Sequence, residues 1–180
     1  LFRKEMRWGN DPAKIKDGLD IKTLDLKPKD QVGFRVIRDG RAMQLLADWD
    51  AGAVLENMTQ DLMATASAVC LISGHDFSPE SCINAGRAMQ RAWLVTEKHG
   101  LAVQPVMAPI FHFARMVHGN GGGMSEQIVA KFAAMHHSFI ELFNLSLTAE
   151  EPLFMFRIFR SEEPAVKSIR LDVDDVYYSN

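Results

Sequence analysis

Residues 78–107 read SPESCINAGRAMQRAWLVTEKHGLAVQPVM, and this stretch decides the fold because it specifies one long helix. Ser78 can accept a hydrogen bond from an early backbone amide of the helix. Pro79 suits the first helical position, where a missing N–H costs nothing. Gly100 can adopt the left-handed conformation that closes a helix. These signals predict a central helix over about residues 79–99.

The composition of this helix predicts burial on more than one side, because apolar side chains occupy most of its circumference. Gly86 costs about 1 kcal/mol relative to alanine in a helix interior. Small neighbours such as Ala85 and Ala92 offset that cost if a second helix approaches closely. The short apolar run that follows, residues 101–106, predicts a buried strand with Pro105 at its end.

The overall composition predicts one soluble, cytoplasmic domain over residues 1–180. The chain is 47% hydrophobic and 24% charged, which is close to the average for globular proteins. Its net charge of −3, without a block of like charges, gives no electrostatic reason to expect a nucleic-acid or membrane partner. Cys70 and Cys82 are expected to be buried apolar residues and not a disulfide. Because residues 1–5 read like a helix already under way, we expect a fragment or the later half of a longer chain.

The remaining periodicities predict an α+β fold. We expect the end of a helix over residues 1–8, a short helix opened by Asp11 and Pro12, and a helix from Gln31 onward. The other expected elements are helices over residues 42–47, 54–66, 108–117 and after Ser125, and strands over residues 67–72 and 153–159.

Residues 84–106 also carry a family resemblance. The pattern AGRAMQRAWLVTEKHGLAVQPV resembles the central helix and following strand of the flavin-dependent nitroreductase family, whose divergent branch has the signature A-G-R-x-x-Q-R-x-x-L…G-L-x-x-x-P. Glu5-Met6-Arg7-Trp8 and Lys167-Ser168-Ile169-Arg170 add scattered similarity. The resemblance implies a mostly antiparallel sheet wrapped by helices, in a homodimer or in a pseudo-dimer with a preceding half.

The same resemblance implies an FMN site. In the family, the segment after the central strand runs along the flavin ring, and its backbone supplies hydrogen-bond donors. The family often has an acid and a glycine where Met107 and Ala108 align, which is a departure. The alternative is that Pro105 merely ends a core strand. The residues matched to this segment are Gln104, Pro105, Val106, Met107 and Ala108.

A basic pair near the carboxyl terminus is the second part of the implied site, because in family members such a pair binds the flavin phosphate. Lys167 and Arg170 match it, and Arg170 is the stronger candidate because a guanidinium can bind phosphate through two hydrogen bonds. The alternative is a solvated surface pair. The family's Arg-rich R-R-S-x-R element has no match here, so either a preceding part of the polypeptide supplies it or the chain binds flavin poorly or not at all.

Other chemistry finds less support in the sequence. No histidine has a carboxylate or cysteine at metal-ligand spacing, and no serine or cysteine has the context of a nucleophile. Residues 119–123, GNGGG, lack the context of a phosphate-binding loop and are expected to form a flexible lid or linker.

The leading hypothesis is therefore an FMN-dependent oxidoreductase that passes electrons from NAD(P)H to a small acceptor, with no side chain acting as acid or base. The first alternative is a non-catalytic nitroreductase-fold module for dimerisation or flavin sequestration. The second is a helical interaction domain, which applies if residues 101–106 and 153–159 are not strands.

Overall fold

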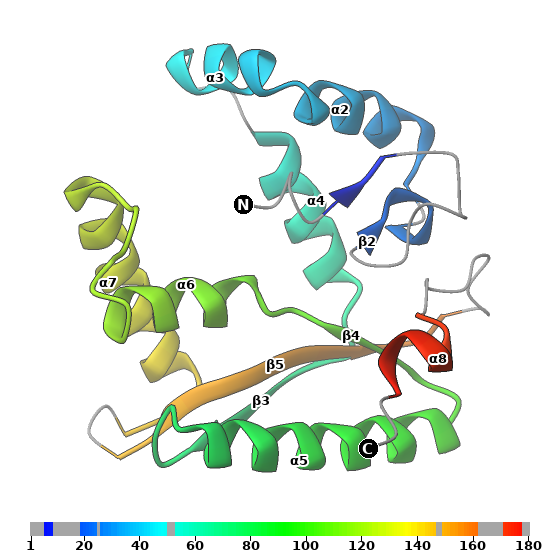
Figure 1. Cartoon of the computed structure of the whole chain (residues 1–180), viewed down its shortest axis with the longest axis vertical. Helices are drawn as coiled ribbons and strands as arrows, with labels where there is room; N and C mark the ends of the chain where they lie inside the picture. The colour runs from blue at the N-terminus through cyan, green and yellow to red at the C-terminus, as the bar shows by residue number, and fades with distance from the viewer. Residues whose placement is uncertain are drawn as a thin grey trace. The chain divides into compact units, whose positions relative to one another are not determined.

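The computed structural model describes residues 6–8, 19–24, 26–49, 53–146, 149–161 and 171–177. The chain divides into two compact units (Figure 1). One comprises Leu1–Leu62 with Glu162–Asn180, and the other comprises Met63–Ser161. The five residues matched to the flavin ring, 104–108, belong to the second unit, so that unit is described first.

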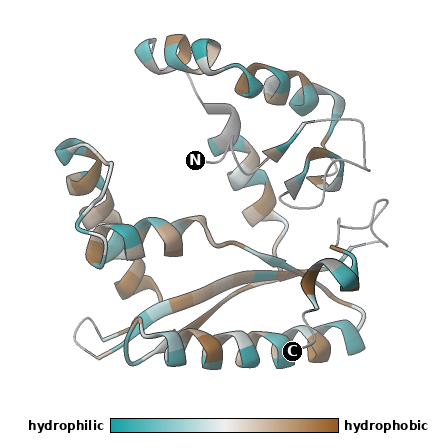
Figure 2. Ribbon diagram, viewed as in Figure 1, coloured by the Kyte–Doolittle hydropathy of each residue, from teal (hydrophilic) through white to brown (hydrophobic). Residues whose placement is uncertain are grey.

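A three-stranded antiparallel sheet forms the centre of the second unit. Its order is β3 (Ala68–Gly74), β5 (Glu151–Phe159) and β4 (Ala102–Pro105), so the strand that comes last in sequence lies in the middle (Figure 1). The central strand is the most buried of the three, and hydrophobic residues occupy most of its length (Figure 2). This burial is expected for a strand with a neighbour on both edges. The strands over residues 101–106 and 153–159 are confirmed, and the α+β class with them.

Helix α5 (Pro79–Lys98) packs on this sheet and has the ends that local chemistry predicts. The Ser78 hydroxyl accepts a hydrogen bond from the Ser81 amide at 3.2 Å. Gly100 has a φ of +68° just after the helix, where a residue with a Cβ would be strained. The predicted central helix is therefore confirmed at both ends.

Burial of α5 is confined to one face within this chain, which differs from the prediction. Ala85 and Met89 are buried, whereas Ile83 is 65% and Leu94 is 60% exposed. A Cβ added to Gly86 would meet no described atom within 4 Å. The apolar circumference of α5 thus exceeds what the rest of the described chain covers.

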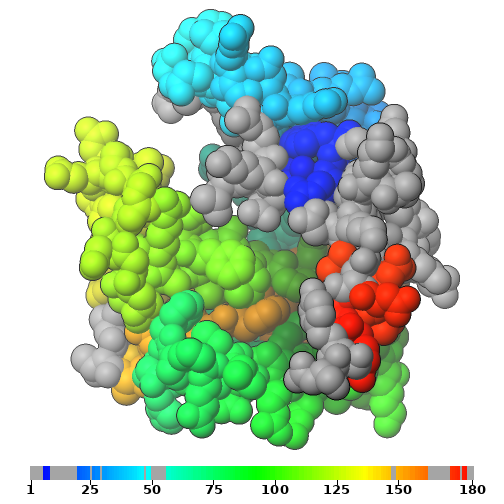
Figure 3. All heavy atoms as spheres, in the orientation of Figure 1, coloured from blue at the N-terminus to red at the C-terminus, as the bar shows by residue number. Residues whose placement is uncertain are grey.

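Helices α6 (Ala108–Val117) and α7 (Glu126–Leu142) complete the second unit. Their contact is largely aromatic. The centroid of the Phe113 ring lies 4.8 Å from that of the His136 ring and 5.1 Å from that of the Phe139 ring. The Ser125 hydroxyl caps α7 by accepting from the Ile128 amide, as expected from the sequence. In the space-filling view a strip of β5 remains visible between α6 and α5 (Figure 3).

The glycine-rich segment between α6 and α7 forms a defined turn. Three of its residues have positive φ: Asn120 at 49°, Gly121 at 65° and Gly123 at 73°. The Arg115 side chain donates a hydrogen bond from Nε to the Gly122 carbonyl. The glycines are therefore needed by the turn itself, and the expected lid or linker role stays a prediction.

The first unit is mainly helical and has a small core of Met6, Phe34 and Ile37. Met6–Arg7 (β1) pairs in parallel with Leu19–Asp20 (β2), so the prediction of a helix end at residues 1–8 is wrong for the described part. Burial of Met6 and a pairing partner more than ten residues away outweigh the local helical pattern. The short helix expected from Asp11 lies outside the described residues. The other elements of the unit are η2 (Ile21–Leu24), α2 (Pro28–Arg38), α3 (Gly40–Asp48), most of α4 (Ala53–Ala64) and α8 (Val173–Val176).

The two cysteines are both free, and they differ in exposure. Cys70 on β3 is half-buried, and its burial raises the pKa of the thiol. Cys82 on α5 is exposed, so the prediction that both are buried is wrong for Cys82. None of the helices in the described ranges is long and apolar enough to cross a bilayer.

Candidate functional site

The junction between β4 and α6 contains the five residues matched to the flavin ring. Because β4 is an edge strand of the described sheet, pairing with β5 leaves its other edge free. The Val106 amide is used by the fold, since it donates to the Met155 carbonyl at 2.8 Å. Pro105 has no N–H to offer. The donors available to a ligand are therefore further along the chain.

These donors are the backbone amides of Met107 and Ala108, at the start of α6. Among the described residues, none accepts a hydrogen bond from either amide. The first amides of a helix lack partners within the helix, and they carry its positive partial charge. Flavin carbonyl oxygens accept hydrogen bonds, so these two amides are donors of the kind that the resemblance implies. The acid and the glycine of the family are absent here, and FMN binding stays a prediction.

A buried arginine lies across the sheet from Gln104. Arg157 on β5 is only 4% exposed and is the register partner of Gln104 on β4. Its Nε donates to Gln104 Oε1 at 2.7 Å, and its Nη1 donates to Thr65 Oγ1 at 2.8 Å. The guanidinium carbon also lies 4.0 Å from the centroid of the Phe159 ring, a cation–π distance. Burial lowers the pKa of Arg157, but a guanidinium stays protonated at any ordinary pH.

Sequence reasoning missed the role of Arg157. The run Leu153–Phe159 was predicted as a strand, but an arginine in a strand gives no indication of its partner. The available signal was a cation in the middle of an aromatic strand, together with a polar residue in the neighbouring strand. The register that puts them opposite each other is a property of the folded sheet.

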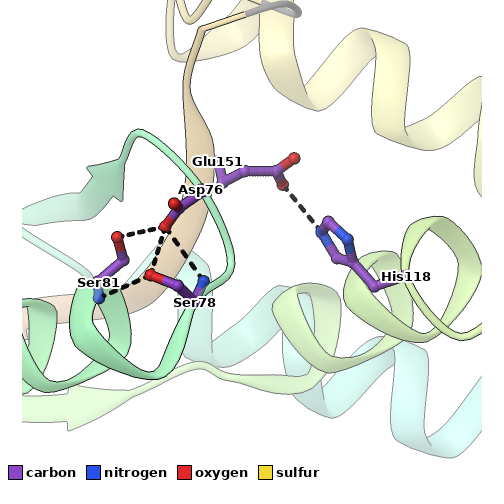
Figure 4. A network of polar contacts seen from close by, with 5 residues as sticks. All are labelled: Asp76, Ser78, Ser81, His118 and Glu151. Atoms are coloured by element: carbon purple, nitrogen blue, oxygen red, sulfur yellow. Dashed lines mark hydrogen bonds and ion pairs between the residues drawn. The ribbon is translucent and has the colours of Figure 1, made fainter.

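A second polar cluster lies where β3 leads into α5 (Figure 4). The Asp76 carboxylate accepts hydrogen bonds from the Ser78 hydroxyl at 2.6 Å and the Ser81 hydroxyl at 2.5 Å. These bonds, first that from the Ser78 side chain, lower the pKa of Asp76 to about 2. All three residues belong to the first turn of α5 or the loop before it, so the cluster acts as an extended helix cap.

The end of α6 is joined to the start of β5 by a polar contact between a histidine and a glutamate beside this cap. His118 Nε2 lies 3.4 Å from Glu151 Oε2 (Figure 4). The Phe77 ring stacks on the imidazole, with centroids 4.9 Å apart. His136 packs nearby in α7, where burial is the main cause that lowers its pKa. Within the described ranges there is no group of three or more histidine, cysteine or acidic residues that could hold a metal ion.

The first unit has a small polar hollow at the junction of α2 and α3. It is lined by Arg35, Arg38, Asp39 and Gly40. Both arginines are in the last turn of α2, where cations offset the negative end of the helix dipole. This placement accounts for the arginines without a ligand.

The two residues matched to the flavin phosphate, Lys167 and Arg170, lie outside the described residues. Their role stays a prediction. The structure therefore describes the ring side of the predicted site and not its phosphate side.

Comparison with known proteins finds a similar sequence, but no similar solved structure. The chain is 34% identical over 170 residues to the uncharacterized protein MT1398 of Mycobacterium tuberculosis. The aligned region covers 92% of this chain and 23% of that protein, so the chain spans about a quarter of the length of this relative. No protein-family model matches the chain, and no solved structure matches it. The helices and the three-stranded sheet of the described residues define the class of the protein as α+β.

Proposed function

We propose that this chain is a nitroreductase-like domain that binds FMN and passes electrons from NAD(P)H to a small acceptor. The observation that carries the proposal is the junction of β4 and α6, where the amides of Met107 and Ala108 pair with no described residue and follow a strand that ends at Pro105. The strand that ends at this junction, β4, comes next after α5, which contains the A-G-R-x-x-Q-R pattern of the resemblance. The supporting evidence is thus a sequence pattern and a local geometry that agree.

The redox chemistry in this proposal belongs to the flavin. The chain's own residues have to hold the ring, donate hydrogen bonds to its acceptor atoms and keep water away. Amides at the start of α6 provide donors without any particular side chain. Arg170 and Lys167 are proposed to bind the phosphate.

A second candidate function is a non-catalytic module for dimerisation or flavin sequestration within a larger protein. Three observations favour it. Met107 and Ala108 replace the acid and the glycine of the family, and the R-R-S-x-R element has no match. Ile83 and Leu94 are exposed apolar side chains on one face of α5, and a second half packed there would cover them.

Flavin loading decides between the two candidates. The purified chain is mixed with FMN, separated from free flavin by gel filtration, and its visible absorbance spectrum is recorded. Retained flavin absorbance, followed by oxidation of NADH or NADPH, supports the oxidoreductase. Retained flavin without nicotinamide oxidation supports sequestration, and a colourless protein contradicts an FMN site in this chain.

The phosphate contact has its own test. Arg170→Ala is expected to weaken FMN binding by about 1.5–3 kcal/mol, the scale for hydrogen bonds to charged groups. The control is Arg41→Ala. Arg41 is an exposed arginine in α3 that has no match in the flavin site, so this variant is expected to leave the dissociation constant for FMN unchanged. Equal affinities for the wild type and Arg170→Ala would remove Arg170 from the site.

A further inference from the structure

The contact between Arg157 and Gln104 determines which way the Gln104 carboxamide faces. A guanidinium has five N–H donors and no acceptor, whereas a carboxamide has one oxygen acceptor and one NH₂ donor group. The group of Gln104 that faces Arg157 must therefore be its oxygen, in agreement with the 2.7 Å contact from Nε to Oε1. The NH₂ group consequently points away from the arginine.

Arg157 is itself held in place by its surroundings. The Thr65 hydroxyl accepts from Nη1 at 2.8 Å, and the Phe159 ring lies against the guanidinium. A side chain that is 4% exposed and has these contacts cannot rotate without losing them. The orientation of the Gln104 amide is thus set by the sheet and needs no ligand to define it.

The NH₂ group of Gln104 remains available. Nothing in the described part of the chain accepts a hydrogen bond from Nε2 of Gln104. No buried side-chain nitrogen or oxygen of the described residues lacks a partner, so this unpaired nitrogen must be accessible from outside. The chain therefore presents an oriented amide donor three residues before the first free backbone amide, that of Met107.

We propose that Gln104 donates a hydrogen bond from its side-chain amide to an acceptor at the pyrimidine edge of the bound flavin, and that Arg157 is the positioning residue that aims it. This inference rests on the proposed FMN site and adds to it a side chain that forms a hydrogen bond with the flavin ring. A flavin pyrimidine edge has carbonyl oxygens and a ring nitrogen that accept hydrogen bonds. A donor aimed at them favours the electron-rich reduced ring, so loss of the donor lowers the midpoint potential of the flavin.

Gln104→Leu removes the NH₂ donor without adding a charge and is measured as the reference for the effect of charge. Gln104→Glu is the main variant, because it keeps an oxygen for Arg157 while it replaces the NH₂ donor by a carboxylate oxygen and adds one negative charge. The experiment measures FMN dissociation constants, midpoint potentials and thermal unfolding for the wild type and both variants. For Gln104→Glu we expect unfolding to be unchanged or shifted upward, affinity to fall about five- to hundred-fold, and the potential to become more negative. Unchanged affinity and potential in Gln104→Glu would overturn the role of Gln104.

The positioning role of Arg157 is tested by a double-mutant cycle with Arg157→Met and Gln104→Leu. If Arg157 acts through Gln104, Arg157→Met weakens FMN binding in the wild type but has little further effect in Gln104→Leu. The same loss in both backgrounds would show a merely structural role and overturn the assignment. If the wild type itself binds no FMN, the proposed function fails and this inference with it, which differs from a wild type that binds and variants that bind equally.

Discussion

Substitution of Gly86 tests whether any other helix packs on the exposed face of α5. The glycine lies inside the helix Pro79–Lys98, and an added Cβ would meet no described atom within 4 Å. Nothing near it would have to move if a methyl group were added. Gly86→Ala therefore changes helix propensity alone.

The expected size of the effect follows from that geometry. Glycine in a helix interior is about 0.5–1 kcal/mol less favourable than alanine, because the unfolded chain loses more freedom on folding. We expect Gly86→Ala to raise the free energy of unfolding by this amount. For a unit of about 100 residues, a change of about 1 kcal/mol raises the melting temperature by about 4–8 °C.

The assay is urea unfolding followed by circular dichroism, repeated over a range of protein concentrations. Gly74→Ala is the matched comparison, because its added Cβ would lie 2.5 Å from Leu153 Cδ1. That variant is expected to lose about 1–3 kcal/mol, the usual cost of overpacking. A loss of stability in Gly86→Ala, particularly one that depends on concentration, would refute the reasoning and indicate a second helix packed closely on this face. In that case Gly86→Leu should also abolish a dimer seen by sedimentation.

Three further outcomes are expected. Gly121→Ala should lose about 2–4 kcal/mol of stability, because its φ is +65° and the new Cβ would lie 2.7 Å from Val129 Cγ2; an unfolding midpoint equal to that of the wild type would contradict the rigid turn. Met155→Ala should lose about 2–5 kcal/mol by leaving a cavity at a site that is 5% exposed, and a smaller loss in urea unfolding would mean that the sheet closes over it. The pKa of Asp76 is lowered to about 2 from an ordinary value of 3.8, so its contribution to stability is present above pH 4 and is lost as the pH falls toward 2. Asp76→Asn should have a smaller fall in unfolding free energy over that pH range, and an identical pH profile would show that the cap does not depend on the charge.

Several elements could be predicted because their signals are local. The start of α5 at Ser78 and Pro79, its end at Gly100 and the cap of α7 at Ser125 each depend on residues within one turn of the boundary. The strand before Pro105 could be read from a short apolar run between two breaking residues. Local backbone chemistry does not change with the rest of the fold, so these predictions are confirmed.

Other features depend on contacts between distant residues and could not be predicted. The pairing of Met6–Arg7 with Leu19–Asp20 overrides a pattern that looks helical by itself. The exposure of Ile83 and Leu94 depends on how many partners α5 has, which its own periodicity cannot report. Of the predicted flavin residues, the structure describes the five at the β4–α6 junction, whereas Lys167 and Arg170 stay predictions.

The amino-acid sequence by itself determined where the central helix begins and ends, that strands flank it, and which segment resembles a flavin site, because caps, breakers and apolar runs act over a few residues. Only the tertiary structure decided that β5 lies between β3 and β4, and that its register puts Arg157 opposite Gln104. Register depends on pairing between strands more than fifty residues apart in the chain. The orientation of the Gln104 amide therefore belongs to the folded sheet.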